Sequence, residues 1–265
     1  MKTYNFPDVS LLITHYNRSE SLDNLLSSFK KLNCEFGEIV VSDDGSKPAY
    51  LEKLKELEIK YNFKLVTTPV NKGLGNNINK GQDAVTCKYT LYVQEDFEPK
   101  SSFPDRFSEA VKFMDDDSKL DLVRFYAYAP YAYLEPFNEF YSSMRKNNYG
   151  IKYKKIYFYS DHPHLRRSDF FNKFGRYPEG IKGDLTEYKM CISFLQNDIK
   201  GLFYTDYKGL FDQINSAAEP STMTNTRSNW RQGEGSLIGI IRNVYRQLKY
   251  NYDIHTMKPL KKVKD

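Results

Sequence analysis

The sequence predicts an α/β fold in which a mostly parallel, Rossmann-like central sheet is flanked by helices. Short runs rich in Ile and Val alternate with segments of helical periodicity through the first hundred residues, and this order is typical of such a sheet with right-handed crossovers. Two of the runs end in acidic pairs, Asp43 with Asp44 and Glu95 with Asp96. Because ligands of open α/β sheets bind beyond the carboxyl ends of the strands, we expect these acids to face a ligand.

The expected elements follow from apolar runs and helical spacing. Strands are expected at 9–14, 39–42, 63–67 and 89–93, and helices at 19–32, 51–61 and 74–85. Ser19 is expected to cap the first helix. Beyond Pro99 a helix is expected over 103–114 and a strand over 120–126, whereas residues 126–160 are rich in Tyr, Phe, Asn and Pro without clean periodicity.

Composition is that of an ordinary globular protein, with 265 residues of which 40% are hydrophobic and 28% charged. The three cysteines, Cys34, Cys87 and Cys191, form no Cys-x-x-Cys pair, which argues against a structural zinc site and for a reducing compartment. No signal peptide and no stretch of roughly 20 apolar residues is present. We therefore expect a cytoplasmic protein.

Carboxylates at strand ends indicate chemistry with a phosphate and a hard cation. Asp-Asp-Gly-Ser at 43–46 is by itself a common turn sequence, because these residues favour turns for backbone reasons. A second acidic pair at 95–96, separated from the first by a helical pattern, favours a nucleotide-phosphate site. Oxygen ligands of this kind suit Mg²⁺ or Mn²⁺.

Four segments together resemble the family 2 glycosyltransferases of the GT-A fold. They are 9–18 (Val-Ser-Leu-Leu-Ile-Thr-His-Tyr-Asn-Arg), 40–46 (Val-Val-Ser-Asp-Asp-Gly-Ser), 71–73 with 79–81 (both Asn-Lys-Gly), and 92–96 (Tyr-Val-Gln-Glu-Asp). Their order and spacing make the resemblance specific over residues 7–100. It implies an inverting enzyme that transfers a sugar from a nucleotide-sugar, usually a UDP-sugar, to a hydroxyl of a glycan or lipid-linked acceptor, as in bacterial capsule or lipopolysaccharide synthesis.

The change of pattern after Pro99 and the charge of the tail suggest a division of the chain, and the resemblance implies a set of site residues. Residues 1–100 would bind the nucleotide-sugar, residues 101–226 of the same domain would bind the acceptor and catalyse transfer, and residues 227–265 form a basic tail. Asp43 corresponds to the acid that contacts the nucleobase, and Asp96 to the acid that ligates Mg²⁺ or Mn²⁺. The implied nucleotide-sugar site comprises Thr14, Tyr16, Asn17, Arg18, Asp43, Asp44, Asn71, Gly73, Asn79, Gln94 and Glu95.

One motif departs from the family pattern, because Gln94-Glu95-Asp96 stands where the family usually has Asp-x-Asp. The amide of Gln94 accepts a hydrogen bond from a ribose hydroxyl but carries no charge. This change leaves two alternatives: the metal binds more weakly, or the nucleotide-sugar differs from the usual one. Asp96 alone can suffice, because Mg²⁺ typically takes only one or two protein carboxylates.

Inverting transfer needs a general base that accepts the proton of the acceptor hydroxyl. Residues 174–180 and 183–188 resemble the family's Gly-x-Phe-x-Glu segment and the Glu-Asp pair at the start of a helix. This implies Asp184 as the base, with Glu187 as its substitute and Glu179 near the acceptor. Judged by residue type alone, Asp184 would equally well cap the helix.

Residues 159–167 hold a cluster of basic and imidazole side chains. His162, His164 and Arg166 are expected to face the acceptor or the diphosphate, where an imidazole could ligate metal and a guanidinium could bind phosphate with two hydrogen bonds. The alternative is a polar loop packed by Tyr and Pro.

The tail contains an amphipathic helical pattern. The whole chain carries a formal charge of +5, and residues 227–265 hold nine Lys or Arg against three Asp or Glu. One predicted face carries Leu237, Ile238, Ile241, Val244, Tyr245 and Leu248, and Arg242, Arg246 and Lys249 lie off it, with Lys258, Lys261, Lys262 and Lys264 beyond. Such a helix could lie peripherally on an anionic membrane or pack on the domain. No nucleic-acid partner is expected, because no fold signature for one appears.

Two other functions are weighed against the transferase. A sugar nucleotidyltransferase would need a Gly-rich phosphate loop after the first strand, and residues 15–18 contain no glycine. A catalytically degenerate protein that binds glycans or nucleic acid on the same fold is the remaining alternative.

Overall fold

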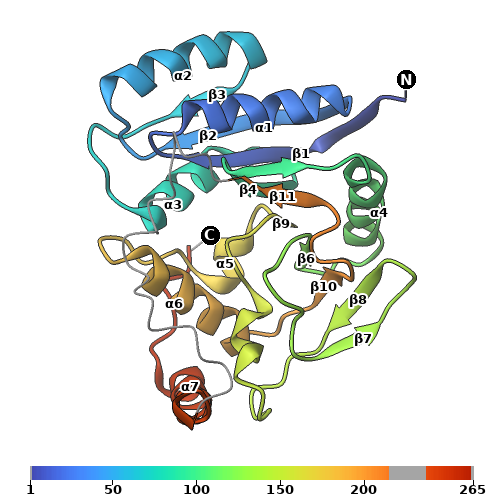
Figure 1. Ribbon diagram of the computed structural model, residues 1–265, viewed down its shortest axis with the longest axis vertical. Helices are drawn as coiled ribbons and strands as arrows, with labels where there is room; N and C mark the ends of the chain where they lie inside the picture. The colour runs from blue at the N-terminus through green and yellow to red at the C-terminus, as the bar shows by residue number, and fades with distance from the viewer. Residues whose placement is uncertain (1, 215–236, 264–265) are drawn as a thin grey trace.

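The computed structural model describes residues 2–214 and 237–263. A nine-stranded sheet with the order β3-β2-β1-β4-β9-β6-β10-β8-β7 runs through the molecule, and β11 pairs with β5 in a separate two-stranded sheet (Figure 1). The strands are β1 (Tyr4–His15), β2 (Cys34–Asp43), β3 (Lys64–Val66), β4 (Tyr89–Gln94), β5 (Phe97–Pro99), β6 (Leu122–Arg124), β7 (Leu134–Pro136), β8 (Tyr141–Met144), β9 (His164–Arg167), β10 (Gly201–Tyr204) and β11 (Phe211–Gln213). The helices are α1 (Ser19–Lys31), α2 (Pro48–Tyr61), α3 (Leu74–Ala84), α4 (Phe103–Asp116), α5 (Phe170–Phe174), α6 (Gly183–Gln196) and α7 (Leu237–Thr256), with a 3₁₀ helix η1 (Tyr153–Phe158).

The parallel part of the sheet places all its carboxyl ends at one edge. β1 pairs in parallel with β2 and β4, and β2 pairs in parallel with β3. In this register His15 lies opposite Asp43, and Thr14 lies opposite Gln94. The predicted fold class is confirmed. Beyond β4 the sheet becomes mixed, because β9 is antiparallel to both β4 and β6.

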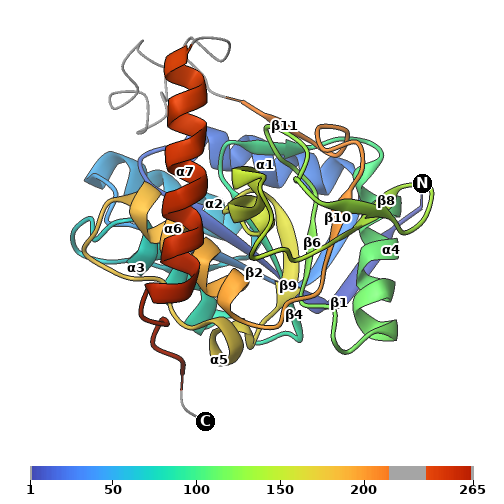
Figure 2. The ribbon, with the colours of Figure 1, turned by 90° about the horizontal axis from the view of Figure 1, so that it is seen from below.

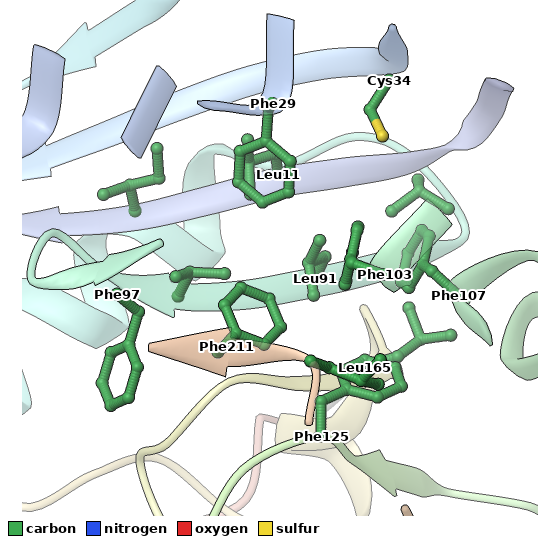
Figure 3. Packing of buried hydrophobic residues seen from close by; sticks show 14 of the residues in the cluster. Leu11, Phe29, Cys34, Leu91, Phe97, Phe103, Phe107, Phe125, Leu165 and Phe211 are labelled. Atoms are coloured by element: carbon green, nitrogen blue, oxygen red, sulfur yellow. The ribbon is translucent and has the colours of Figure 1, made fainter. Parts of the chain in front are cut away.

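Each face of the sheet buries its own hydrophobic core. Leu11 and Ile13 belong to one core, whereas Leu12 between them belongs to the other, because successive strand residues point to opposite faces. Helices α1, α2 and α4 contribute to the first core, and α3, α5 and α6 to the second. Figure 3 shows the first core, where Phe103 and Phe107 of α4 pack with Phe125. Burying a side chain of this size contributes roughly 1.5–3 kcal/mol.

Local details differ from the expectations. Ser19 is the first residue of α1 rather than its cap; Arg18 holds the N-cap position and makes no side-chain capping bond. The segment 126–160 contains β7, β8 and η1, whose short lengths leave too few residues for a periodic pattern.

α7 packs outside α6 and η1, at the end of the molecule opposite α2 (Figures 1 and 2). Residues 227–236 and Lys264 of the predicted tail lie outside the described residues. None of the helices in the described part combines the length and the apolar character that crossing a bilayer requires.

Candidate active site

Asp43 is the buried anchor of the edge where the parallel strands end. Its Oδ1 accepts hydrogen bonds from His15 Nδ1 (2.9 Å) and Ser46 Oγ (2.5 Å), and its Oδ2 from the Ser46 N–H (3.1 Å) and Thr67 Oγ1 (2.7 Å). His15 Nδ1 carries the proton, since Nε2 accepts the Arg18 N–H at 3.2 Å. Burial raises the pKa of Asp43, but these hydrogen bonds outweigh it and hold the pKa well below its usual value. The ionised carboxylate therefore ties together the loops after β1, β2 and β3.

Groups of the protein surround the Asp43 carboxylate, for which the resemblance implies a contact with the nucleobase. The side chain is fully buried, because four donors of the protein surround its two oxygens. Asp43 thus fixes the positions of the loops around it through these hydrogen bonds. The half-buried Tyr16 and the exposed Asn71 lie on the loops that it helps to hold.

Asp44 performs a similar task for the loop that follows β3. Its Oδ1 accepts the Lys72 N–H at 2.8 Å, and its Oδ2 accepts the Gly73 N–H at 2.9 Å. Gly45 has φ +67°, and a Cβ there would overlap the backbone of Val70. Only glycine allows both this conformation and this approach.

Asn17 closes the loop after β1 onto the start of α2. Its N–H donates to Ser46 Oγ at 2.8 Å, and its Oδ1 accepts the Lys47 N–H at 2.8 Å. Thr14 lies deeper, with Oγ1 3.1 Å from Tyr92 Oη. These contacts make Asn17 and Thr14 structural parts of the site rather than exposed ligand groups.

Asp96 lies just beyond β4 and has an unusual environment. Arg18 Nη1 lies 3.5 Å from Asp96 Oδ2 and 3.7 Å from Glu95 Oε1, and Gln213 Nε2 donates to the same Asp96 oxygen at 2.9 Å. Within the described residues, Asp96 Oδ1 is buried and has no hydrogen-bond partner. A buried oxygen without a partner is costly, so Oδ1 fits a cation that arrives with a ligand.

The described part of the chain does not complete a metal site. Across residues 2–214 and 237–263, no group of three or more His, Cys, Asp or Glu side chains is arranged to hold a metal ion. Arg18 also joins Asp96 to the rest of the edge, because its backbone N–H binds the His15 ring that holds Asp43. Asp96 and Asp43 therefore share one connected edge of the sheet.

Asp184 lies in the first turn of α6 and is exposed. The N-cap position belongs to Lys182, and no side-chain bond caps the helix, so the capping alternative for Asp184 does not describe this structure. Gly183 faces Leu74 of α3, at 3.7 Å from where a Gly183 Cβ would lie. The start of α6 therefore lies against the start of α3, next to the loop that Asp44 holds.

The half-buried Glu187, one turn further along α6, contacts the buried Asp161. Glu187 Oε1 accepts the Asp161 N–H at 3.1 Å, and Asp161 Oδ1 accepts hydrogen bonds from Tyr159 (2.8 Å) and Tyr177 (3.2 Å). Burial raises the pKa of both carboxyls, and the negative charge of Asp161 raises the pKa of Glu187 further. Sequence reasoning missed Asp161, although it lies within the segment that drew attention to its neighbours.

Two buried arginines balance this pair. Arg124 donates to the Tyr157 carbonyl at 2.5 Å and to Ser160 Oγ at 2.7 Å, and its charge lowers the pKa of Glu187. Arg166 likewise lowers the pKa of Asp161. Near the start of α6 the site thus has two carboxyl groups, of Asp161 and Glu187, and two guanidinium groups, of Arg124 and Arg166.

His164 and Arg166, which were expected at the acceptor or diphosphate, bind protein groups in this structure. Both side chains are buried in β9. His164 donates from Nδ1 to the His162 carbonyl (2.7 Å) and accepts at Nε2 from Arg166 (3.1 Å), whose other amino group donates to Gln82 Oε1 at 2.7 Å. The strand that carries them pairs with β4 on one side and β6 on the other.

His162 is also held by protein groups. Its ring packs against Tyr126, Tyr128 and Phe97, and Nδ1 lies 3.1 Å from Ser160 Oγ. Burial and the charge of Arg124 lower the pKa of His162 to about 3, so the imidazole is neutral at physiological pH.

Asn79, expected in the nucleotide site, instead joins α3 to the segment before α6. Its buried amide exchanges two hydrogen bonds with the Tyr177 backbone, at 2.9 and 3.0 Å. Its Nδ2 also donates to Glu179 Oε1 at 2.8 Å, and Asn76 donates to Oε2 at 2.7 Å. Glu179, which is exposed, thus binds two side chains of α3 in this structure.

Comparison with known proteins decides the family. The sequence profile described as Glycosyl transferase family 2 matches residues 10–175. The chain belongs to this family. The resemblance inferred from the four segments is confirmed.

Individual family 2 relatives match only in part. A poly-beta-1,6-N-acetyl-D-glucosamine synthase of Staphylococcus epidermidis is 32% identical over 88 residues, which are 33% of this chain and 21% of the synthase. A cholesterol galactosyltransferase of Borreliella burgdorferi is 28% identical over 120 residues, 45% of this chain and 33% of that protein. The chain therefore spans about a fifth to a third of the length of these relatives.

Solved structures support the GT-A fold of this family 2 chain. Residues 1–349 of S. aureus TarS in complex with UDP-GlcNAc align with a TM-score of 0.59 and 20% identity, covering 77% of this chain and 57% of that one. The mannosyltransferase PcManGT from Pyrobaculum calidifontis, in complex with GDP-Man and Mn²⁺, aligns with a TM-score of 0.53 and 12% identity, covering 78% and 58%. At these identities the likeness concerns the fold.

Proposed function

We propose that this chain is an inverting glycosyltransferase that moves a sugar from a UDP-sugar to a hydroxyl of a glycan or lipid-linked oligosaccharide. Family membership supports the reaction class, and the UDP-GlcNAc complex of TarS on the same fold supports the donor class. The observation that carries the proposal is the buried Asp96 Oδ1, which has no hydrogen-bond partner among the described residues, at the sheet edge where Asp43 anchors the loops.

The donor would lie along the loops after β1, β2 and β3. Asp43 and Asp44 keep these loops in place through hydrogen bonds within the protein. Direct contacts with base and ribose then fall to the backbone near Tyr16, to Asn71 and to Gln94. A preorganised loop binds more tightly, because its ordering does not have to be paid for on binding.

A divalent cation, Mg²⁺ or Mn²⁺, fits the residues at the end of β4. Asp96 would hold it through Oδ1 with Glu95 beside it, together with phosphate oxygens of the donor, because residues 2–214 and 237–263 by themselves supply too few ligands. When bound, such a cation offsets the charge that develops on the leaving diphosphate. Arg18, between the two carboxylates, keeps them in position.

Proton transfer would be the task of the start of α6. Asp184 is exposed there and lies close to the loop held by Asp44, so it is our candidate for the general base. Glu187 follows at i+3 on the same side of the helix. The raised pKa of Glu187 makes it the second candidate, because a base works best when its pKa lies near the working pH.

The test is turnover of UDP-GlcNAc and related UDP-sugars with Mn²⁺, measured as UDP release. We expect release by the wild type, and Asp96→Asn to lower it by roughly 10²-fold or more. Asp212→Asn is the matched control, because it makes the same change in an exposed acid on nearby β11. Its rate should stay within about twofold, as for most surface changes.

Two results would contradict the proposal. Full activity of Asp96→Asn would show that the Asp96 carboxylate is not needed to hold the cation. Binding of UDP-sugars without any release of UDP would favour a protein that has kept the fold and lost catalysis.

A further inference from the structure

α7 presents its apolar residues to solvent. Six large side chains of this helix are between 54% and 68% exposed: Ile240, Ile241, Val244, Tyr245, Leu248 and Tyr252. With 3.6 residues per turn, positions 241, 244, 245, 248 and 252 form one continuous stripe. A surface helix ordinarily turns such a stripe towards the core.

The opposite, largely polar face of α7 makes the contacts with the domain. Gln247 Nε2 donates to the Gly150 carbonyl at 2.6 Å, and Asn251 accepts a hydrogen bond from the buried Lys155. Asp253 accepts one from Tyr188 at 2.5 Å. Ile254, which is buried, adds apolar contact on this face. The helix is therefore held in place without its stripe.

Two further exposed side chains extend the stripe sideways. Tyr149 is 82% and Ile151 87% exposed, and the Tyr149 ring stacks on His255 of α7 with centroids 5.2 Å apart. We call these two residues and the six on α7 the α7 patch. Adjoining exposed hydrophobic residues in this number mark an interaction site, because monomeric proteins rarely leave such surfaces uncovered.

Charge indicates what covers the patch. Residues 237–263 contain six Lys or Arg and one Asp, a surplus of five that equals the formal charge of the whole chain. Arg242 and Arg246 lie along one side of the stripe, because they follow it by about a quarter to a third of a turn, whereas the neighbouring Lys249 is ion-paired with Asp253. An apolar stripe beside a basic one is typical of helices that lie in the interface of an anionic membrane.

We infer that the α7 patch docks this protein peripherally on an anionic lipid surface, with the helix parallel to that surface. A second copy of the chain fits less well, because a twofold interface would bring two such positively charged segments together. α7 lies at the end of the molecule opposite α2 (Figures 1 and 2). Docking would therefore leave the first parallel strands and their loops accessible from solution.

The test measures sedimentation of the full chain with vesicles of phosphatidylcholine alone and with added phosphatidylglycerol. We expect binding to the anionic vesicles, and Ile241→Glu combined with Leu248→Glu to lower the partition coefficient by at least about tenfold. The control variant is Ile59→Glu, which introduces a glutamate at an 85% exposed residue of α2. That control should bind within about threefold of the wild type, since it adds one negative charge away from the patch.

Further measurements separate the possible outcomes. Circular dichroism and thermal melting should show that the double variant folds, because both sites are exposed. Equal vesicle binding by the double variant and the wild type would overturn the inference, as would a wild-type dimer that the double variant dissociates while neither binds vesicles. UDP-sugar binding in solution should be unchanged in the variant, so failure of this inference is distinguishable from failure of the proposed transferase.

Discussion

Asp184 and Glu187 lie one helical turn apart at the start of α6 and compete for the role of general base. Asp184 is exposed, whereas Glu187 is tied to the Asp161 backbone. Sequence resemblance favoured Asp184, and its exposed position is compatible with that choice. The raised pKa of Glu187 makes it a candidate for the general base as well.

The two candidates are separable by substitution. We expect Asp184→Asn to keep donor affinity and to lower transfer by roughly 10²-fold or more, the usual contribution of a general base. Glu187→Gln should lower the rate less and change the pH profile on its alkaline side, because it removes a carboxyl whose pKa is raised to about 8. Steady-state rates between pH 5.5 and 9 check this. A fully active Asp184→Asn would move the role to Glu187.

The same glutamate makes a prediction about stability. Its folded pKa is raised above the unfolded value near 4.5, so the native state retains a proton that the unfolded chain loses. Stability is then unaffected below about pH 4.5 and falls as the pH rises towards the folded pKa. Glu187→Gln, which can still accept the Asp161 N–H, should therefore melt higher than the wild type at pH 8, by roughly 2–4 °C for each kcal/mol relieved.

Thermal melts at pH 5 and pH 8 provide the comparison. The advantage of Glu187→Gln should be larger at pH 8, and Asp198→Asn, a change in an exposed acid, should show none. A variant that melts lower than the wild type at both pH values would show that the carboxylate stabilises the fold.

At the scale of elements, the contact between α3 and α6 positions both candidate bases. Gly75 of α3 lies so close to the segment before α6 that a Cβ would overlap the Pro178 carbonyl and come within 2.9 Å of Thr186 Oγ1. Thr186 donates to that same carbonyl. The absence of a side chain at position 75 thus sets how closely the two helices approach.

Gly75→Ala should push the start of α6 away from the sheet edge. We expect transfer to fall by about tenfold or more, because misplacement by 1 Å can cost up to 10²-fold, while the fold persists with a lower melting temperature. Gly183→Ala is the matched control, because its Cβ would make only an ordinary contact with Leu74 at 3.7 Å. Equal losses in both variants would show that the close approach at Gly75 has no special role.

α7 shows how an element can be predicted correctly and oriented unexpectedly. Its apolar face was visible in the spacing of Ile241, Val244 and Leu248, and packing on the domain was one of two alternatives. The structure packs the helix through Gln247, Asn251 and Asp253 instead. Which face a helix buries depends on the partners that the rest of the chain presents, and these are not local.

At the scale of the whole molecule, the sheet joins the two halves of the chain. β9 inserts between β4 and β6 with antiparallel pairing on both sides. The carboxyl ends of β1, β2 and β4 therefore stay at one edge. The second half of the chain contributes Asp161 and Glu187, which a hydrogen bond joins. The division of function at residue 100 remains a prediction.

The parallel strands, the loops with Asp43 and Asp96, and the family were readable from the chain alone. Each depends on runs of neighbouring residues, where apolar periodicity and turn residues act over a few positions. The burial of His164 and Arg166 was not predictable, because the sequence of a polar segment does not show which distant groups, such as Gln82, will bond to it inside the fold. Asp161 with Glu187, the unpartnered oxygen of Asp96 and the outward stripe of α7 came only from three-dimensional contacts, because burial and hydrogen bonding are set by residues far away along the sequence.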